Sequence, residues 1–221
     1  MGTKITFRRP DGKEAAGYLA KAGRANAPGI VVIQEWWGLQ GHLRSLRTRR
    51  LRGAGAGPLR RHRRSLPRQG RGWTRDELAQ LPRRDGPDRS RGRLLLNKAS
   101  VKVGLTGFCM GGALTILGAC RIPEISAAVC FYGLPPEAVA KPADVKVPLQ
   151  AHFANKDDWC TPQAVDKFEA GLKAAGKSAE VFRYDAEHGF VNEQRDVHDR
   201  TAAELAWERT LSFWATHLDG Q

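Results

Sequence analysis

Short apolar runs rich in β-branched residues recur along the chain and alternate with helical stretches. A continuous apolar run of four to six residues is typical of a strand buried on both faces, as in a parallel sheet. Such runs predict strands at 30–33, 101–105, 126–131, 148–153 and 179–184. Residues 5–20 differ, because two short runs flank the turn signal at residues 10–12, and they predict a hairpin.

Helical patterns fill the intervals between these strands. A helix is expected from about Ala113 to Cys120, and another begins at Thr161-Pro162, which reads as a cap and a first helical residue. In this second helix, Phe168 and Leu172 share one face. A terminal helix over 201–217 offers four residues to the core: Leu205, Leu211, Phe213 and Trp214.

The alternation of strands and helices predicts an α/β fold, with a mostly parallel sheet covered by helices on both faces. The length of 221 residues fits a single domain spanning 1–221 and suffices to bury a substantial core.

Residues 41–97 depart from this pattern. They contain 17 Arg and no Lys against four acidic residues, which accounts for the whole net charge of +13. From Gly41 to Leu96 there is no Val, Ile, Phe, Tyr or Met, so no strand is predicted there. We expect an irregular Arg/Gly/Pro-rich segment inside an otherwise neutral chain, and a disrupted central region of the fold.

Two bulk features bear on the cellular setting. No run of 18 apolar residues exists, so no transmembrane helix is expected, and residues 1–10 lack the apolar stretch of a secretory signal. The four cysteines form no CxxC pair, which argues against a zinc knuckle and favours reduced thiols in the cytoplasm. No metal and no organic cofactor is expected, because the ligand spacings are absent, and we favour a monomer.

The sequence Gly107-Phe108-Cys109-Met110-Gly111 joins a predicted buried strand to a predicted helix. Gly-x-Cys-x-Gly in this context is a nucleophile elbow with cysteine in place of serine. The helix would aim its N-terminus at Cys109, which stabilises a thiolate. The backbone N–H of Met110 would donate to a developing oxyanion. Alone, the pattern fits equally a glycine-rich turn with a structural cysteine.

An acid and a histidine follow in the order that such a hydrolase needs, each after a strand. His188 follows the strand expected to end at Tyr184, and it would act as the general base or as the ion-pair partner of a thiolate. Asp157 and Asp158 compete for the acid that orients the imidazole. We prefer Asp158, four residues before Pro162.

These residues resemble the dienelactone hydrolase family, also called carboxymethylenebutenolidase. Four pieces carry the resemblance: residues 34–38 (Gln-Glu-Trp-Trp-Gly), residues 107–112, Asp158 with Pro162, and His188-Gly189-Phe190. The resemblance covers about 1–40 and 97–221. It implies an α/β-hydrolase fold with a Cys-His-Asp triad, and hydrolysis of a small-molecule lactone or ester through a thioester.

The resemblance also implies roles for two residues after the first parallel strand. Glu35 stands where the family has a glutamate that contacts the resting cysteine and takes part in its activation. The backbone N–H of Trp36 would be the second oxyanion donor. One departure concerns the substrate, because the family's arginine four residues after the histidine is replaced by Asn192.

Two other hypotheses depend on the 41–97 segment. A local reading-frame shift in a GC-rich gene would generate such a composition and leave an inactive or damaged homologue, which resequencing the DNA would test. Alternatively, a block of like charge could bind a polyanion. We disfavour nucleic-acid binding, because the block lies within a hydrolase framework and offers only Trp73 for stacking.

Overall fold

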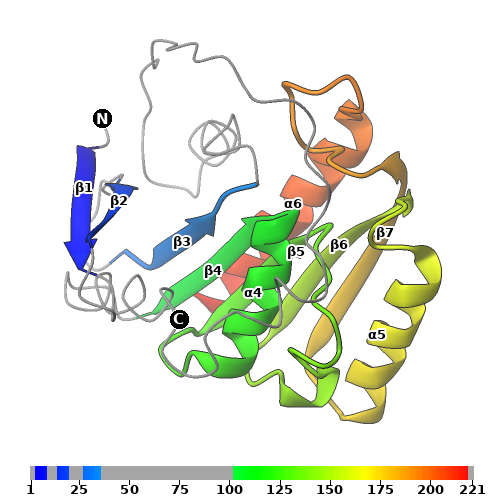
Figure 1. Ribbon diagram of the computed structural model, residues 1–221, viewed down its shortest axis with the longest axis horizontal. Helices are drawn as coiled ribbons and strands as arrows, with labels where there is room; N and C mark the ends of the chain where they lie inside the picture. Colours follow the sequence, from blue (N-terminus) through cyan, green and yellow to red (C-terminus); the bar gives the residue numbers. More distant parts are fainter. Residues whose placement is uncertain (1–2, 9–13, 20–26, 36–101, 219–221) are drawn as a thin grey trace.

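The protein is described here from a computed structural model, which covers residues 3–8, 14–19, 27–35 and 102–218. Its centre is a sheet of five parallel strands whose spatial order, β3-β4-β5-β6-β7, is also their order in the chain (Figure 1). The strands are β3 (Gly29–Ile33), β4 (Val103–Phe108), β5 (Ala127–Phe131), β6 (Leu149–Lys156) and β7 (Ala179–Glu187). Because the strands are parallel, the residues that follow them meet at one edge of the sheet.

Helices cover both faces of this sheet, so the predicted α/β architecture is confirmed. Side chains of α4 (Met110–Arg121) and α5 (Pro162–Ala174) share one apolar cluster with β5 and β6. Side chains of α6 (Arg200–His217) belong to a second cluster, which includes Phe108 and Phe131. Figure 1 shows α6 on the opposite side of the sheet from α4 and α5. A short 3-10 helix, η1 (Pro142–Asp144), precedes β6.

The apolar runs of the sequence at β4 and β5 form strands that are buried on both faces, as expected. Every residue of β4 and of β5 is buried, because each strand packs against helices on both faces. In β5, Val129 and Phe131 face the α6 cluster, whereas Ala128 and Cys130 face the α4–α5 cluster. The period of two along a strand thus divides one apolar run between two cores.

The remaining predicted elements are present with shifted boundaries. The hairpin is confirmed as β1 (Thr3–Arg8) paired antiparallel with β2 (Glu14–Leu19). The strand β6 continues three residues beyond the predicted end at residue 153, and β7 continues three beyond residue 184. Thr161 caps α5 as expected, because its hydroxyl accepts a hydrogen bond from the Ala164 N–H.

The prediction for α6 holds for two of its four core residues. Phe213 and Trp214 are buried as expected, whereas Leu205 is 39% exposed and Leu211 is only partly buried. Ala206 and Trp207 fill the part of the core that Leu205 was expected to fill, because the buried stripe follows the 3.6-residue helical period one position later. The Arg-rich segment 41–97 lies outside the described residues. None of the described helices is both long and apolar enough to cross a membrane.

The first turn of α4 lies directly against the ends of β3 and β5, the two strands that flank β4. A Cβ on Gly111 would collide with the Ile33 carbonyl oxygen, and one on Gly112 would lie 2.5 Å from the Phe131 carbonyl oxygen. These contacts involve backbone atoms, which cannot move aside as a side chain can. The start of α4 is therefore fixed between the ends of β3 and β5.

We expect Gly112→Ala to lower the free energy of unfolding by about 3 kcal/mol, because the new methyl group overlaps backbone atoms in a packed core. Urea denaturation followed by circular dichroism measures this change. The control is Gly176→Ala, where the methyl group meets nothing within 4 Å and only the φ of +63° is unfavourable. That variant should lose about 1 kcal/mol. Equal losses in the two variants would show that the α4 contact is not tight.

Candidate active site

Cys109 occupies a strained turn between β4 and α4. Its φ of 56° and ψ of −118° lie outside the regions that a non-glycine residue ordinarily adopts. Its backbone N–H donates to the Phe131 carbonyl oxygen at 3.0 Å, and its carbonyl oxygen accepts from the Gly112 and Ala113 N–H groups. The thiol is partly exposed. The turn therefore has the conformation expected of a nucleophile elbow, with the N-terminus of α4 beside the sulfur.

His188 directly follows β7, and its partner is the carboxylate of Asp157, which directly follows β6. His188 Nδ1 donates to Asp157 Oδ2 at 2.7 Å. The other carboxylate oxygen, Oδ1, accepts from the backbone N–H groups of Trp159 and Cys160 at 2.8 and 2.9 Å. The Asp157 side chain has no exposed surface, whereas that of His188 is 22% exposed. Asp157 is thus held on one side by the loop while it orients the imidazole on the other.

The preference for Asp158 as the acid is wrong. Asp158 is exposed, and it is Asp157 that contacts His188. Because β6 runs on to Lys156, Asp157 is the first residue after the strand, and its side chain turns inward to cap the following loop. The turn itself leaves a signal in sequence, since aspartate commonly accepts hydrogen bonds from N–H groups two and three residues later.

The electrostatics of the pair depart from those of free side chains. Burial acts to lower the pKa of His188, but the hydrogen bonds that the imidazole donates to Asp157 and Cys109, with the charges of both groups, outweigh it and raise that pKa from 6.5 to about 9. Burial likewise acts to raise the pKa of Asp157, but His188 and the two backbone N–H groups lower it below 3.8. At neutral pH the imidazole is therefore protonated and lies between a carboxylate and the Cys109 sulfur.

Glu35 follows β3 and is buried, with 1% of its surface exposed. Its Oε1 accepts a hydrogen bond from the Tyr132 hydroxyl at 2.9 Å, and its Oε2 accepts one from Asn192 Nδ2 at 2.8 Å. Tyr132 follows β5 and Asn192 lies just beyond β7. The ends of three strands therefore supply one buried carboxylate and two donors to it.

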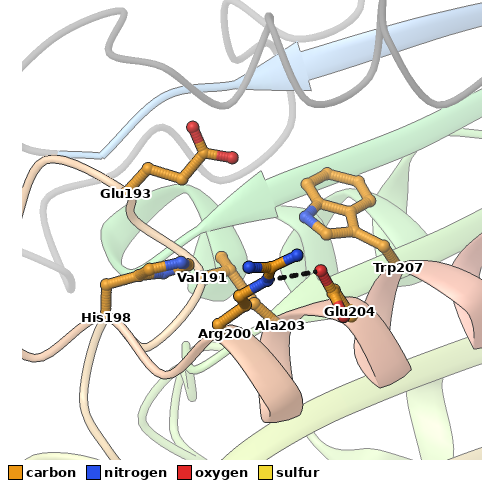
Figure 2. A pocket seen from close by; sticks show the side chains of 7 residues that line it. All are labelled: Val191, Glu193, His198, Arg200, Ala203, Glu204 and Trp207. Carbon is orange, nitrogen blue, oxygen red and sulfur yellow. Dashed lines mark hydrogen bonds and ion pairs between the residues drawn. The ribbon is translucent and has the colours of Figure 1, made fainter.

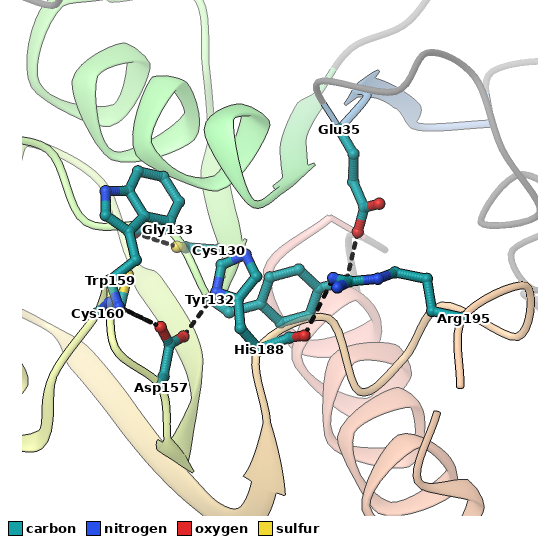
Figure 3. A network of polar contacts seen from close by, with 9 residues as sticks. All are labelled: Glu35, Cys130, Tyr132, Gly133, Asp157, Trp159, Cys160, His188 and Arg195. Carbon is teal, nitrogen blue, oxygen red and sulfur yellow. Dashed lines mark hydrogen bonds and ion pairs between the residues drawn. The ribbon is translucent and has the colours of Figure 1, made fainter. Parts of the chain in front are cut away.

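Aromatic rings flank the imidazole. The His188 ring lies 5.0 Å from the Tyr132 ring and 5.4 Å from the Trp159 ring between centroids, both in edge arrangements. Figure 3 shows His188 between these two rings, with Asp157 on one side of it and Glu35 on the other side of the Tyr132 phenol. The guanidinium of Arg195 donates to the His188 carbonyl oxygen at 3.2 Å. These contacts restrict the orientation of the imidazole ring.

The structure thus brings together three of the residues that sequence analysis singled out, Cys109, His188 and Glu35, and replaces Asp158 by Asp157. Met110 is the first residue of α4. Trp36 lies outside the described residues.

Two residues of the site were missed, Tyr132 and Asn192. Tyr132 directly follows the strand predicted at 126–131, and any residue at that edge of the sheet is a candidate for the site. The sequence marks Asn192 only as a departure from the family's arginine. The hydrogen bonds of both to Glu35 join residues 97 and 157 positions apart in the chain.

A separate pocket of about 220 Å³ lies at the start of α6 (Figure 2). It contains an ion pair between Arg200 Nε and Glu204 Oε1 at 2.9 Å. Its lining residues are Val191, Glu193, His198, Arg200, Ala203, Glu204 and Trp207. None of the predicted site residues lines it. Within the described part of the chain, no three His, Cys, Asp or Glu residues gather where they could hold a metal ion.

The sequence is similar to those of known proteins. A model of the dienelactone hydrolase family matches residues 91–218. "Protein usf" of Aquifex pyrophilus is 30% identical over 246 residues, covering 99% of this chain and all of the relative. "Putative carboxymethylenebutenolidase" of Aquifex aeolicus is equally similar, at 30% identity over the same share of both chains.

A solved structure agrees with the fold. The crystal structure of "Putative Dienelactone Hydrolase" from Klebsiella pneumoniae superposes with a TM-score of 0.74 at 20% identity and covers 98% of this chain and 99% of that one. This likeness shows the α/β-hydrolase fold. The chain belongs to the dienelactone hydrolase family and is a hydrolase of the carboxylic ester type.

Proposed function

We propose that this hydrolase cleaves a small-molecule lactone or carboxylic ester through a Cys109-His188-Asp157 triad and a thioester intermediate. The observation that carries the proposal is the continuous chain of contacts from Asp157 through the imidazole of His188 to a cysteine in a strained elbow. The name of the Aquifex aeolicus relative, a carboxymethylenebutenolidase, supports a lactone as substrate. The expected monomer and cytoplasmic location stay predictions.

The first half-reaction transfers the acyl group to sulfur. Asp157 accepts the Nδ1–H of His188, so Nε2 is the ring nitrogen that serves Cys109. The protonated imidazole stabilises a Cys109 thiolate, which attacks the carbonyl carbon. As the tetrahedral intermediate collapses, the carbon–oxygen bond of the ester breaks and His188 gives its proton to the leaving oxygen. A thioester on Cys109 remains.

The second half-reaction returns the enzyme to its starting state. His188, now neutral, accepts a proton from water as the water oxygen attacks the thioester carbon. The carbon–sulfur bond breaks, the carboxylic acid leaves, and the thiolate and imidazolium are restored. In both steps the negative oxygen would accept from the Met110 N–H at the N-terminus of α4, with the Trp36 N–H as second donor. Glu35 would assist the formation of the thiolate.

Cys109→Ala should lower the turnover of p-nitrophenyl acetate by at least about 10³-fold, because it removes the nucleophile. The matched control is Cys120→Ala, which removes a buried thiol of α4 away from the elbow and should stay within about twofold of wild type. Mass spectrometry of quenched wild-type protein should find one acetyl group on Cys109. Activity that survives in Cys109→Ala would overturn the proposal.

Asp157→Asn and its neighbour Asp158→Asn form a second matched pair. Asp157→Asn should lower kcat/KM by about 10³-fold, because the imidazole loses the carboxylate that orients it and stabilises its charge. Asp158→Asn should stay within about twofold, because that side chain is exposed. Steady-state kinetics on the same ester measures both values. The reverse ranking would return the role of the acid to Asp158.

The Asp157–His188 pair should also make stability depend on pH. His188 binds its proton more tightly in the folded protein, with a pKa of about 9 against 6.5 for the ordinary group. Its contribution to stability is therefore complete below pH 6.5 and is lost as the pH rises through 9. The lowered pKa of Asp157 acts at the other end, since its contribution is present above pH 3.8 and is lost as the pH falls below that value.

Wild type should therefore have a higher free energy of unfolding than Asp157→Asn. This difference should be largest near pH 6 and should shrink toward pH 10. Urea denaturation at both pH values measures it. A difference that grows with pH would contradict the assigned charge state of His188.

A further inference from the structure

Two neutral donors contact the buried carboxylate of Glu35, one at each oxygen. The Tyr132 hydroxyl lies 2.9 Å from Oε1 and the Asn192 amide nitrogen lies 2.8 Å from Oε2. Hydrogen bonds donated to a carboxylate favour its ionised form, and because both donors are neutral they do so without cancelling its charge. With the carboxylate 1% exposed, these bonds replace the water that would otherwise solvate the charge.

Tyr132 is fixed in place more firmly than an ordinary strand-end residue. Its φ of 36° is a left-handed value that is rare outside glycine, and its backbone N–H donates to the His152 carbonyl oxygen at 2.8 Å. Its ring has no exposed surface and contacts the rings of His188 and Phe190. Burial, followed by the charge of Glu35, raises the pKa of Tyr132 well above 10, so the phenol stays a donor.

The orientation of Asn192 is fixed as well. Its side-chain oxygen accepts from the Gln194 N–H at 3.0 Å, and its own backbone N–H donates to the Gly189 carbonyl oxygen at 2.9 Å. With the oxygen committed to the backbone, the amide nitrogen must face Glu35. Asn192 is 2% exposed, so the whole residue is committed to the interior.

The Tyr132 hydroxyl contacts Glu35, and the charges of both Glu35 and Cys109 act to raise the pKa of this phenol, so the carboxylate and the thiol both lie near it. Among the residues that the structure describes, the other charged or titratable groups around Glu35 and Cys109 include Asp157 and Cys160 after β6, and His188 and Arg195 after β7. Glu35 and Asp157 are thus carboxylates near the Cys109–His188 pair.

We propose that Tyr132 and Asn192 are positioning residues that together hold Glu35 ionised and oriented toward the Cys109–His188 pair. This inference rests on the proposed function, because the clamped carboxylate acts by assisting the formation of the Cys109 thiolate. An ionised Glu35 favours the protonated imidazole and can accept the thiol proton. Without either donor, Glu35 takes up a proton more readily. As the pH falls, it therefore stops assisting thiolate formation at a higher pH than in wild type.

The test is the pH profile of kcat/KM for p-nitrophenyl acetate. Tyr132→Phe keeps the ring and removes one donor, and Asn192→Leu removes the other. Each should lower kcat about tenfold with KM changed by less than about twofold, and each should move the acid limb of the profile upward by about one pH unit. Asn192→Asp should move the limb further, because two facing carboxylates cannot both ionise readily.

Two controls separate positioning from a general loss of stability. Tyr184→Phe removes the hydroxyl of another buried tyrosine, which contacts His152 and Arg209 rather than Glu35, and should leave the acid limb in place. In a Glu35→Gln background, Tyr132→Phe should add little further loss of kcat, because the residue through which it acts is already neutral.

An unchanged acid limb in Tyr132→Phe and Asn192→Leu would overturn the inference, and so would a full Tyr132→Phe effect in the Glu35→Gln background. Failure of the proposed function looks different. In that case Cys109→Ala would retain turnover, whereas failure of this inference alone leaves Cys109→Ala inactive while the donor variants keep the wild-type profile.

Discussion

The site depends on the close contact between the first turn of α4 and the ends of the strands beside it. Only glycine fits where α4 meets the carbonyl oxygens of Ile33 and Phe131, so the helix starts immediately after Cys109 and cannot slide along the sheet. This contact forces Cys109 into a strained conformation, and the hydrogen bond to the Phe131 carbonyl oxygen holds it there. The strain is sustained because β4, which leads into Cys109, and its neighbour β5 are buried at every residue, so the surrounding backbone cannot relax.

A second constraint is electrostatic. Glu35 and Asp157, two buried carboxylates, lie near the Cys109–His188 pair, and each is held by hydrogen-bond donors instead of water. Asp157 uses backbone N–H groups of its own loop together with His188, whereas Glu35 uses side chains from two other strand ends. Of the two, Asp157 acts on the imidazole directly, and together with Cys109 it raises the pKa of His188 to about 9, so the ring stays protonated above its ordinary range. A protonated imidazole beside a thiol is the arrangement that makes a thiolate available for attack at neutral pH.

Buried residues within β6 and β7 support the site that lies at the ends of these strands. His152, on β6, is fully buried, and burial lowers its pKa to about 3, so it is neutral. Its ring stacks on Phe131 and bonds to Tyr184 and Gln150, and its carbonyl oxygen accepts from the Tyr132 N–H. This polar network therefore packs against the residues that carry both strained conformations. Through its hydrogen bonds the network connects β6 with β7 and α6, and so it stabilises the positions of the strand ends.

The sequence by itself determined the class of fold and the position of the candidate elbow. Buried apolar runs, turn signals and the Gly-x-Cys-x-Gly pattern are local features, and they located the strands, the cap at Thr161, Cys109 and His188. Tertiary structure alone decided which groups meet. Asp157 rather than Asp158 reaches His188 because β6 runs three residues further than its apolar run, as pairing with β7 requires. Tyr132 and Asn192 meet Glu35 across distances in the chain that no local pattern records. Parallel strands bring distant residues to one edge, and which side chains touch there is fixed by register and packing.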